Sequence, residues 1–102
     1  MFYYIPSVIR VTPKEDYHVE VMFDNGRVVD YDASELLEEE GCEALQSVDV
    51  FMKTCKVLGG TLAWDLSGAN DPADCIDVDP TMLYECRALN DNLFFMGLGV
   101  MD

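Results

Sequence analysis

Basic residues and histidine are scarce in this sequence. Its 102 residues include one histidine and six Lys plus Arg, against 20 Asp plus Glu, which gives a formal net charge of −14. Such a charge repels a phosphate backbone, so direct nucleic-acid binding is not expected. The acidic surface leaves two interpretations, a simply solvated surface or a face that meets a basic protein partner.

Export signals, membrane spans and a cysteine framework are also missing. Residues 1–6 lack the charged start of a signal peptide, and no apolar run reaches the ~20 residues of a bilayer span. The four cysteines, at positions 42, 55, 75 and 86, form no Cys-x-x-Cys pair. Only one histidine is available as a further ligand, so a structural zinc site is not expected. We expect a cytoplasmic protein with reduced thiols, no metal and no cofactor.

The length and composition that remain predict one folded domain. Half of the residues are apolar, and 102 residues suffice for a single hydrophobic core. We place one α+β domain at residues 1–90 and an apolar tail at residues 91–102. The tail is too apolar to leave fully exposed, so it packs either on its own domain or in a dimer contact.

Alternating apolar residues predict a first antiparallel hairpin. Residues 8–11, between two prolines, predict a short strand, and residues 17–23 predict a clearer one. A type I turn with a bulge at Gly26 would then pair Val21 with Val29 and bury both side chains. We prefer this turn to a two-residue turn, which would set Val21 opposite an aspartate.

A second hairpin is predicted around the glycine pair at residues 59–60. A two-residue turn there pairs Val57 with Leu62 and Cys55 with Trp64. The fold class that follows is α+β, with a small, mostly antiparallel sheet of two hairpins packed against two short helices.

The first of these helices is predicted after the first hairpin. Asp32 and Glu35 have the spacing of a helix cap, which predicts a short helix to about Glu40, ended by Gly41. Residues 44–48 could add a helical turn before Phe51 begins extended chain again.

The second helix is predicted after an aspartate-rich loop. Residues 65–79 are rich in Asp, Gly, Asn and Pro, and they lead through a short strand at residues 75–78. Asp79 and Pro80 suit the start of the helix, and Met82, Leu83 and Cys86 would form its inward face.

Residues that carry catalysis are few. His18 lies on the polar side of a strand, which favours a role facing solvent or a partner over general-base catalysis. The cysteines lack a nucleophile signature, and the glycine pairs lack a phosphate-binding pattern. The loop aspartates suggest calcium, yet Gly68 is misplaced for a calcium loop and no Glu closes it. We expect no catalytic, cofactor or metal residues and hence no enzyme.

The order of motifs nevertheless resembles a known family. The matching segments are Val19-x-Val21-x-Phe23 with Asp24-Asn25-Gly26, residues 31–37, Phe51, Val57, Trp64 and residues 76–84. This pattern is similar to the bacterial domain-of-unknown-function family 2442 over residues 6–86. The resemblance implies a small α+β fold without an established activity, and an antitoxin-like or accessory role.

Three functions remain open at this stage. The leading hypothesis is a protein-binding regulatory or accessory module whose acidic face meets a basic partner. The first alternative is a small-ligand binder or enzyme with a pocket near Trp64, His18 and the aspartate-rich loop. The second is a structural homo-oligomerisation domain joined through the tail or a free sheet edge.

Overall fold

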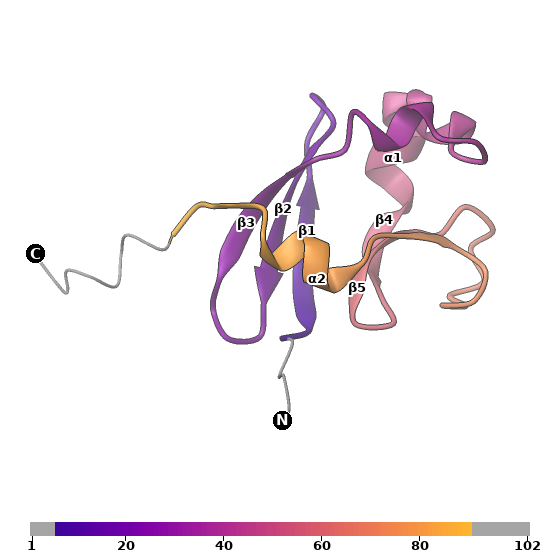
Figure 1. Ribbon diagram of the computed structural model, residues 1–102. Helices are drawn as coiled ribbons and strands as arrows, with labels where there is room; N and C mark the ends of the chain where they lie inside the picture. Colours follow the sequence, from indigo (N-terminus) through magenta and orange to yellow (C-terminus); the bar gives the residue numbers. More distant parts are fainter. Residues whose placement is uncertain (1–5, 91–102) are drawn as a thin grey trace, which may run out of the picture.

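The computed structural model describes residues 6–90, which form two antiparallel sheets (Figure 1). The first sheet has the strand order β1-β2-β3-β7 and the second has the order β4-β5-β6. The strands are β1 (Val8–Pro13), β2 (His18–Phe23), β3 (Val28–Asp32), β4 (Cys55–Leu58), β5 (Thr61–Trp64), β6 (Ile76–Asp77) and β7 (Arg87–Ala88).

The hairpin of β2 and β3 has the predicted register. Val21 lies opposite Val29, and both side chains are fully buried. The turn closes where the Gly26 N–H donates to the carbonyl of Phe23 at 3.0 Å, and Gly26 has a φ of 92°. A positive φ is a conformation that glycine adopts at little cost, so the bulged turn is confirmed.

The hairpin of β4 and β5 is also confirmed. Cys55 lies opposite Trp64 and Val57 lies opposite Leu62. Every residue of β5 is buried, so this strand is covered on both faces. An alternating pattern is not needed in such a strand, because neither face meets water.

The prediction of an α-helix from Asp32 to about Glu40 is wrong. A short 3₁₀ turn, η1 (Leu36–Glu38), stands there instead, followed by a second one, η2 (Glu43–Gln46). The Asp32 carboxylate accepts the Ser34 N–H at 3.0 Å and the Ser34 hydroxyl at 2.7 Å. Local bonds of this kind compete with helix formation and favour a turn.

Phe51 does not begin extended chain, and that prediction is wrong as well. It lies inside α1 (Val48–Thr54), which Ser47 caps. The Phe51 ring is fully buried and packs on Tyr17 at 4.8 Å and on Trp64 at 5.4 Å between ring centroids. Tertiary packing of this ring therefore favours a helix in a segment whose β-branched residues have only modest intrinsic helix propensity.

The last helix, α2 (Pro80–Tyr84), begins where the sequence predicts. The Asp79 carboxylate accepts the Thr81 N–H at 2.9 Å, and the proline occupies the first turn. Leu83 is fully buried, but Met82 is 44% exposed and does not belong to an inward face. The helix is too short to bury three apolar side chains on one side.

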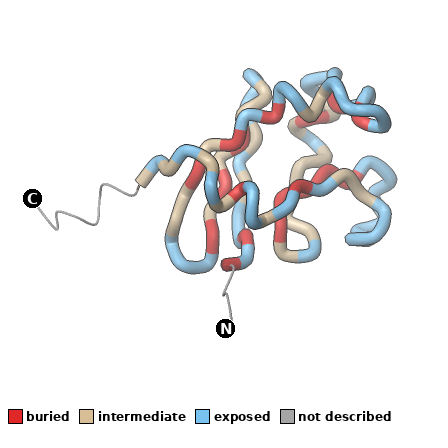
Figure 2. The backbone as a smooth tube through the Cα atoms, viewed as in Figure 1, coloured by how far each residue is buried: buried red, intermediate tan, exposed pale blue. Residues whose placement is uncertain are grey.

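The core lies between the two sheets, with α2 crossing between them and α1 at one end of β4 (Figure 1). Figure 2 shows the buried positions gathered along the strands and helices that enclose this space. The largest fully buried side chains are those of Trp64, Phe23, Phe51, Leu45, Leu62 and Leu83. The α+β fold class is confirmed, although the first α-helix, α1, begins at Val48 and not near Asp32 as predicted.

All four cysteines are free thiols, and burial raises the pKa of Cys55 to about 12. No helix among residues 6–90 is long and apolar enough to cross a membrane. The apolar tail predicted at residues 91–102, and the first five residues of the domain predicted at 1–90, lie outside the described residues.

Candidate binding groove

An acidic groove opens along the end of β3. It encloses about 380 Å³ and lies between η1 on one side and α2 with β7 on the other. β7 pairs with β3 only at Val29 and Asp30. β3 extends two residues beyond Asp30, and the groove lies beside this end of the strand, which β7 does not cover. The residues that line it are Asp30, Tyr31, Asp32, Glu35, Leu36, Glu39, Met82, Cys86 and Arg87.

The polar rim of the groove is strongly negative. It carries the carboxylates of Asp30, Asp32, Glu35 and Glu39 and one guanidinium, that of Arg87, so the lining has a formal charge of −3. Within residues 6–90, the side chains of Glu35 and Glu39 make no hydrogen bond and no ion pair. These two carboxylates are therefore available to a cationic group.

The turn after β3 sets the position of the two glutamates. The Ser34 bonds to Asp32 start this turn, and the Glu39 N–H donates to the carbonyl of Leu36 at 3.1 Å. Glu35 precedes η1 and Glu39 follows it, and both line the groove beside Leu36.

The floor of the groove is apolar. Tyr31, Leu36, Met82 and Cys86 contribute to it, and Tyr31 is only 8% exposed. Burial raises the pKa of Tyr31 to about 12, and burial also raises the pKa of Cys86. Both groups are therefore uncharged at neutral pH, and the negative charge is confined to the rim.

Polar and aromatic contacts hold α2 and β7 against the first hairpin. Arg27 Nε donates to the Tyr84 carbonyl at 3.0 Å, and its guanidinium lies 4.8 Å from the centre of the Tyr84 ring. Asn90 accepts the Val28 N–H at 3.0 Å and donates to the Gly26 carbonyl at 2.8 Å. These bonds, which join residues about 60 positions apart, hold in place the α2 and β7 segments that form one wall of the groove.

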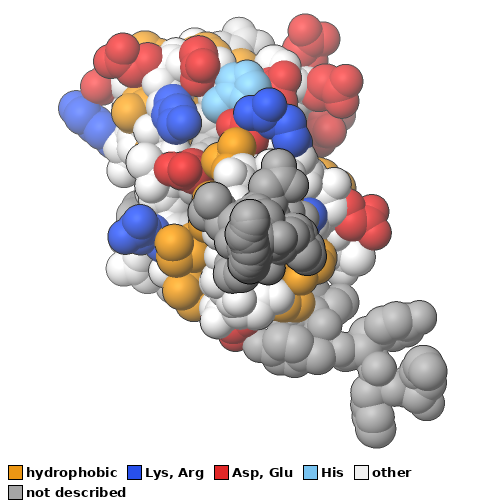
Figure 3. Space-filling model, turned by 90° about the vertical axis from the view of Figure 1, so that its left-hand side faces the viewer, with side chains coloured by type: hydrophobic (Ala, Val, Ile, Leu, Met, Phe, Trp, Pro, Cys, Tyr) orange, Lys and Arg blue, Asp and Glu red, His pale blue; other side chains and the backbone are white. Residues whose placement is uncertain are grey.

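His18 stands beside the groove at the start of β2. Its Nδ1 lies 2.9 Å from Asp30 Oδ2, and its Nε2 lies 3.9 Å from Asp32 Oδ2. The hydrogen bond to Asp30 raises the pKa of His18, and the charges of Asp30, Asp32 and Asp16 act in the same direction. Figure 3 shows the histidine among acidic and basic side chains on this side of the molecule.

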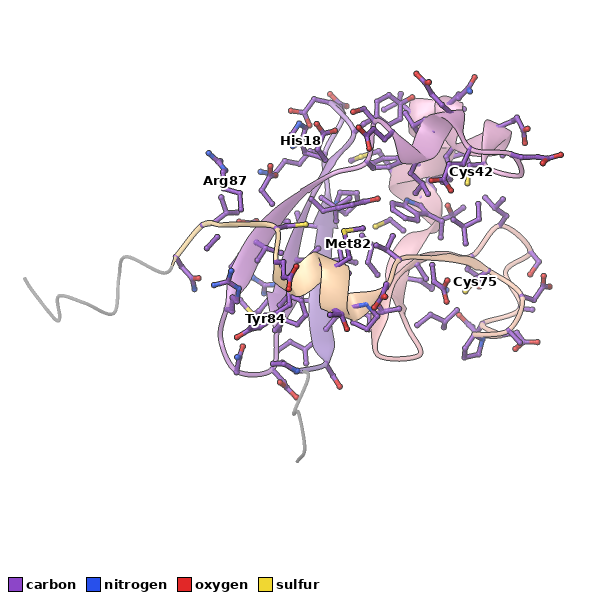
Figure 4. The ribbon with its side chains drawn as sticks, in the orientation of Figure 1. His18, Cys42, Cys75, Met82, Tyr84 and Arg87 are labelled. Carbon is purple, nitrogen blue, oxygen red and sulfur yellow. The ribbon has the colours of Figure 1, made fainter. Side chains whose placement is uncertain are left out.

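The structure does not bring together the residues of the predicted pocket. Trp64 is fully buried in the core, and neither this groove nor the smaller hollow beside β1 is lined by it. His18 belongs to the first sheet, whereas Cys75, inside the aspartate-rich loop, is labelled on the opposite side of Figure 4.

The loop aspartates bond to their own chain. Asp65 accepts the Asn70 N–H at 2.9 Å and pairs with Lys56 at 3.5 Å, while Asp71 accepts the Ala73 N–H at 2.9 Å. In the part of the chain that the structure describes, no group of three His, Cys, Asp or Glu side chains is arranged to hold a metal ion.

Sequence reasoning missed most of the groove. It placed Met82 on the inward face of the last helix, whereas Met82 is 44% exposed and lines the groove. The one available signal was the spacing of Glu35 and Glu39 around Leu36. The opposite wall depends on β7, which has two residues and no periodic pattern.

Comparisons with known proteins identify the family of this chain. The family described as "Protein of unknown function (DUF2442)" matches residues 8–87. No curated protein and no solved structure matches the chain. The resemblance over residues 6–86 is confirmed, and the chain belongs to the DUF2442 family.

Proposed function

We propose that this protein is a non-enzymatic binding module that receives a basic segment of a partner protein in the acidic groove. The observation that carries the proposal is the arrangement of four carboxylates around an apolar floor at the uncovered end of β3. A regulatory or accessory role, of the antitoxin-like kind, is one form that such binding could take.

The shape of the groove suits the side chains of lysine and arginine. Both have an apolar stem that packs on hydrophobic surface while the charged head reaches polar groups. Leu36 and Met82 offer surface for the stem, and Glu35 and Glu39 offer acceptors for the head. A charge-assisted hydrogen bond is stronger than a neutral one, which favours a cation over a neutral polar group.

The expected affinity is modest, because three of the four rim carboxylates, those of Asp32, Glu35 and Glu39, are exposed to solvent. Asp32, for example, has a side chain that is 57% exposed. An exposed ion pair contributes roughly 0.2–1 kcal/mol, so selectivity requires several pairs together. The net charge of −14 adds long-range attraction, which raises the association rate with a basic partner at low ionic strength.

Fluorescence anisotropy with a labelled basic peptide tests the proposal. The probe is the pentapeptide Lys-Leu-Arg-Leu-Lys, compared with a neutral peptide that has glutamine at its three basic positions. We expect saturable binding of the basic peptide alone. The double variant Glu35→Gln with Glu39→Gln should weaken this binding by about tenfold, since two exposed ion pairs together supply roughly 1.4 kcal/mol.

A matched variant separates the groove from the overall charge. Glu15→Gln with Glu43→Gln removes the same two charges from exposed positions that do not line the groove. This control should bind like the wild type. Equal weakening in both double variants would show that net charge alone attracts the peptide, and absence of binding in the wild type would also overturn the proposal.

A further inference from the structure

His18 is a titratable residue in contact with the carboxylates of the groove, so its protonation changes the charge that a ligand meets there. We propose that binding of a basic segment in the groove is coupled to loss of a proton from His18, so that the protein binds this ligand more tightly as pH rises. The inference rests on the proposed function and adds a regulating residue to the same site.

The geometry places His18 between two carboxylates of the rim. Asp30 and Asp32 both line the groove, and His18 contacts the first at 2.9 Å and approaches the second at 3.9 Å. The side chains of His18 and Asp30 are 34% and 18% exposed, so the pair is only partly screened by water. A protonated imidazole at this point neutralises charge that a basic ligand would otherwise meet.

Other charged residues near His18 do not provide the same switch. The Asp16 carboxylate accepts the His18 N–H at 3.2 Å, and the Lys14 N–H donates to the His18 carbonyl at 2.8 Å. Glu20 and Arg87 lie opposite Asp30 on its two neighbouring strands. Histidine is the residue type whose ordinary pKa, about 6.5, lies between pH 6 and 8.5, so we assign the switch to His18.

The direction of the coupling follows from linkage. The hydrogen bond to Asp30 raises the pKa of His18 above its usual value, so the imidazole keeps its proton to a higher pH. A cationic ligand repels the imidazolium and therefore favours the neutral imidazole. The bound protein should have a lower His18 pKa than the free protein, and a proton is released to solvent on binding.

The test is to measure the affinity of the Lys-Leu-Arg-Leu-Lys peptide for the whole protein from pH 6.0 to pH 8.5 at constant ionic strength. We expect affinity to rise by about three- to tenfold across this range, as one charge is removed from the rim. The variants His18→Asn and His18→Gln should bind with an affinity that no longer depends on pH and that matches the wild type at pH 8.5.

A second readout follows the histidine itself. Titration of the His18 ring protons by NMR, with and without the peptide, should show a lower pKa in the complex. Peptide binding that is equally strong at every pH, or that keeps its pH dependence in both His18 variants, would overturn the coupling and leave the proposed function standing. Absence of binding at every pH overturns both.

Discussion

The acidic groove and the aspartate-rich loop carry similar side chains but use them differently. In the loop, residues 65–79, carboxylates accept backbone N–H groups of Asn70, Ala73 and Thr81. In the groove, Glu35 and Glu39 have no such partner among the described residues and stand beside an apolar floor. The short aspartate side chains bond to nearby backbone N–H groups and stabilise turns. The longer glutamate side chains leave their charge available at the surface.

The comparison also explains why composition alone misleads. The loop has more aspartates close together than the groove has. This run of aspartates suggested a cation site or the edge of a pocket. Asp65, Asp71 and Asp79 each accept a backbone N–H from a residue a few positions further along the chain, and among the described residues the loop carboxylates form no group arranged to hold a metal ion. The groove is built instead from two segments that are distant in sequence, residues 30–39 around β3 and η1 and residues 82–87 around α2 and β7.

The largest effect should come from the buried residue that precedes the loop. Trp64→Ala should lower the free energy of unfolding by about 3–5 kcal/mol, because it removes a fully buried side chain from the core. Urea denaturation measures this loss. A wall of an open ligand pocket would tolerate the change far better, so a loss below about 1 kcal/mol would restore that alternative.

Trp64→Phe is the matched control for this prediction. The indole N–H has no hydrogen-bond partner among residues 6–90, so its removal sacrifices no bond. Phenylalanine keeps most of the aromatic packing on Phe51, and we expect a clearly smaller loss than with alanine.

The next largest effect concerns the groove. The double reversal Glu35→Lys with Glu39→Lys should reduce affinity for the basic peptide by about a hundredfold, because reversing a charge doubles the change made by removing it. Thermal denaturation should remain close to that of the wild type, since these exposed side chains make no hydrogen bond or ion pair with any residue in the described range 6–90. A strongly destabilised variant would mean that the glutamates shape the fold, as the loop aspartates do.

On the loop side, Asp79→Ala removes the cap of α2. The lost bond to the Thr81 N–H should lower the free energy of unfolding by about 1 kcal/mol, measured by urea denaturation. Asp79→Ser keeps a capping oxygen without the charge and should recover most of the loss. If serine fails to recover stability, the charge and not the cap would be the cause.

The smallest effect is the pH dependence of stability at His18. A raised pKa in the folded state stabilises the fold below the unfolded pKa of about 6.5, and this contribution disappears as pH rises through the folded pKa. The stability difference between the wild type and His18→Asn should therefore be larger at pH 5.5 than at pH 8. A difference that grows toward pH 8 would contradict the hydrogen bond to Asp30.

Local patterns predicted much of the fold from the sequence. The registers around Gly26 and around residues 59–60 follow from turn chemistry and alternation, and Asp79 with Pro80 identifies the start of α2. These features depend on neighbours within a few residues, which a single sequence displays.

Long-range packing could not be predicted in the same way. Phe51 lies in a helix because its ring packs on Tyr17 and Trp64, which are 34 and 13 positions away. β7 exists because Asn90 bonds to the turn at residues 26–28 and two residues pair with β3. The groove also depends on long-range packing, because the fold brings its two walls together. Its residues could therefore not be grouped from the sequence alone.

The most direct measurement is an NMR titration of the ¹⁵N-labelled protein with the Lys-Leu-Arg-Leu-Lys peptide at pH 8. We expect chemical-shift changes confined to the groove, at residues 30–39 and 82–87, with the loop at residues 65–75 unchanged. Shift changes centred on the loop, or spread evenly over all acidic surfaces, would contradict the claim that the groove is the binding site.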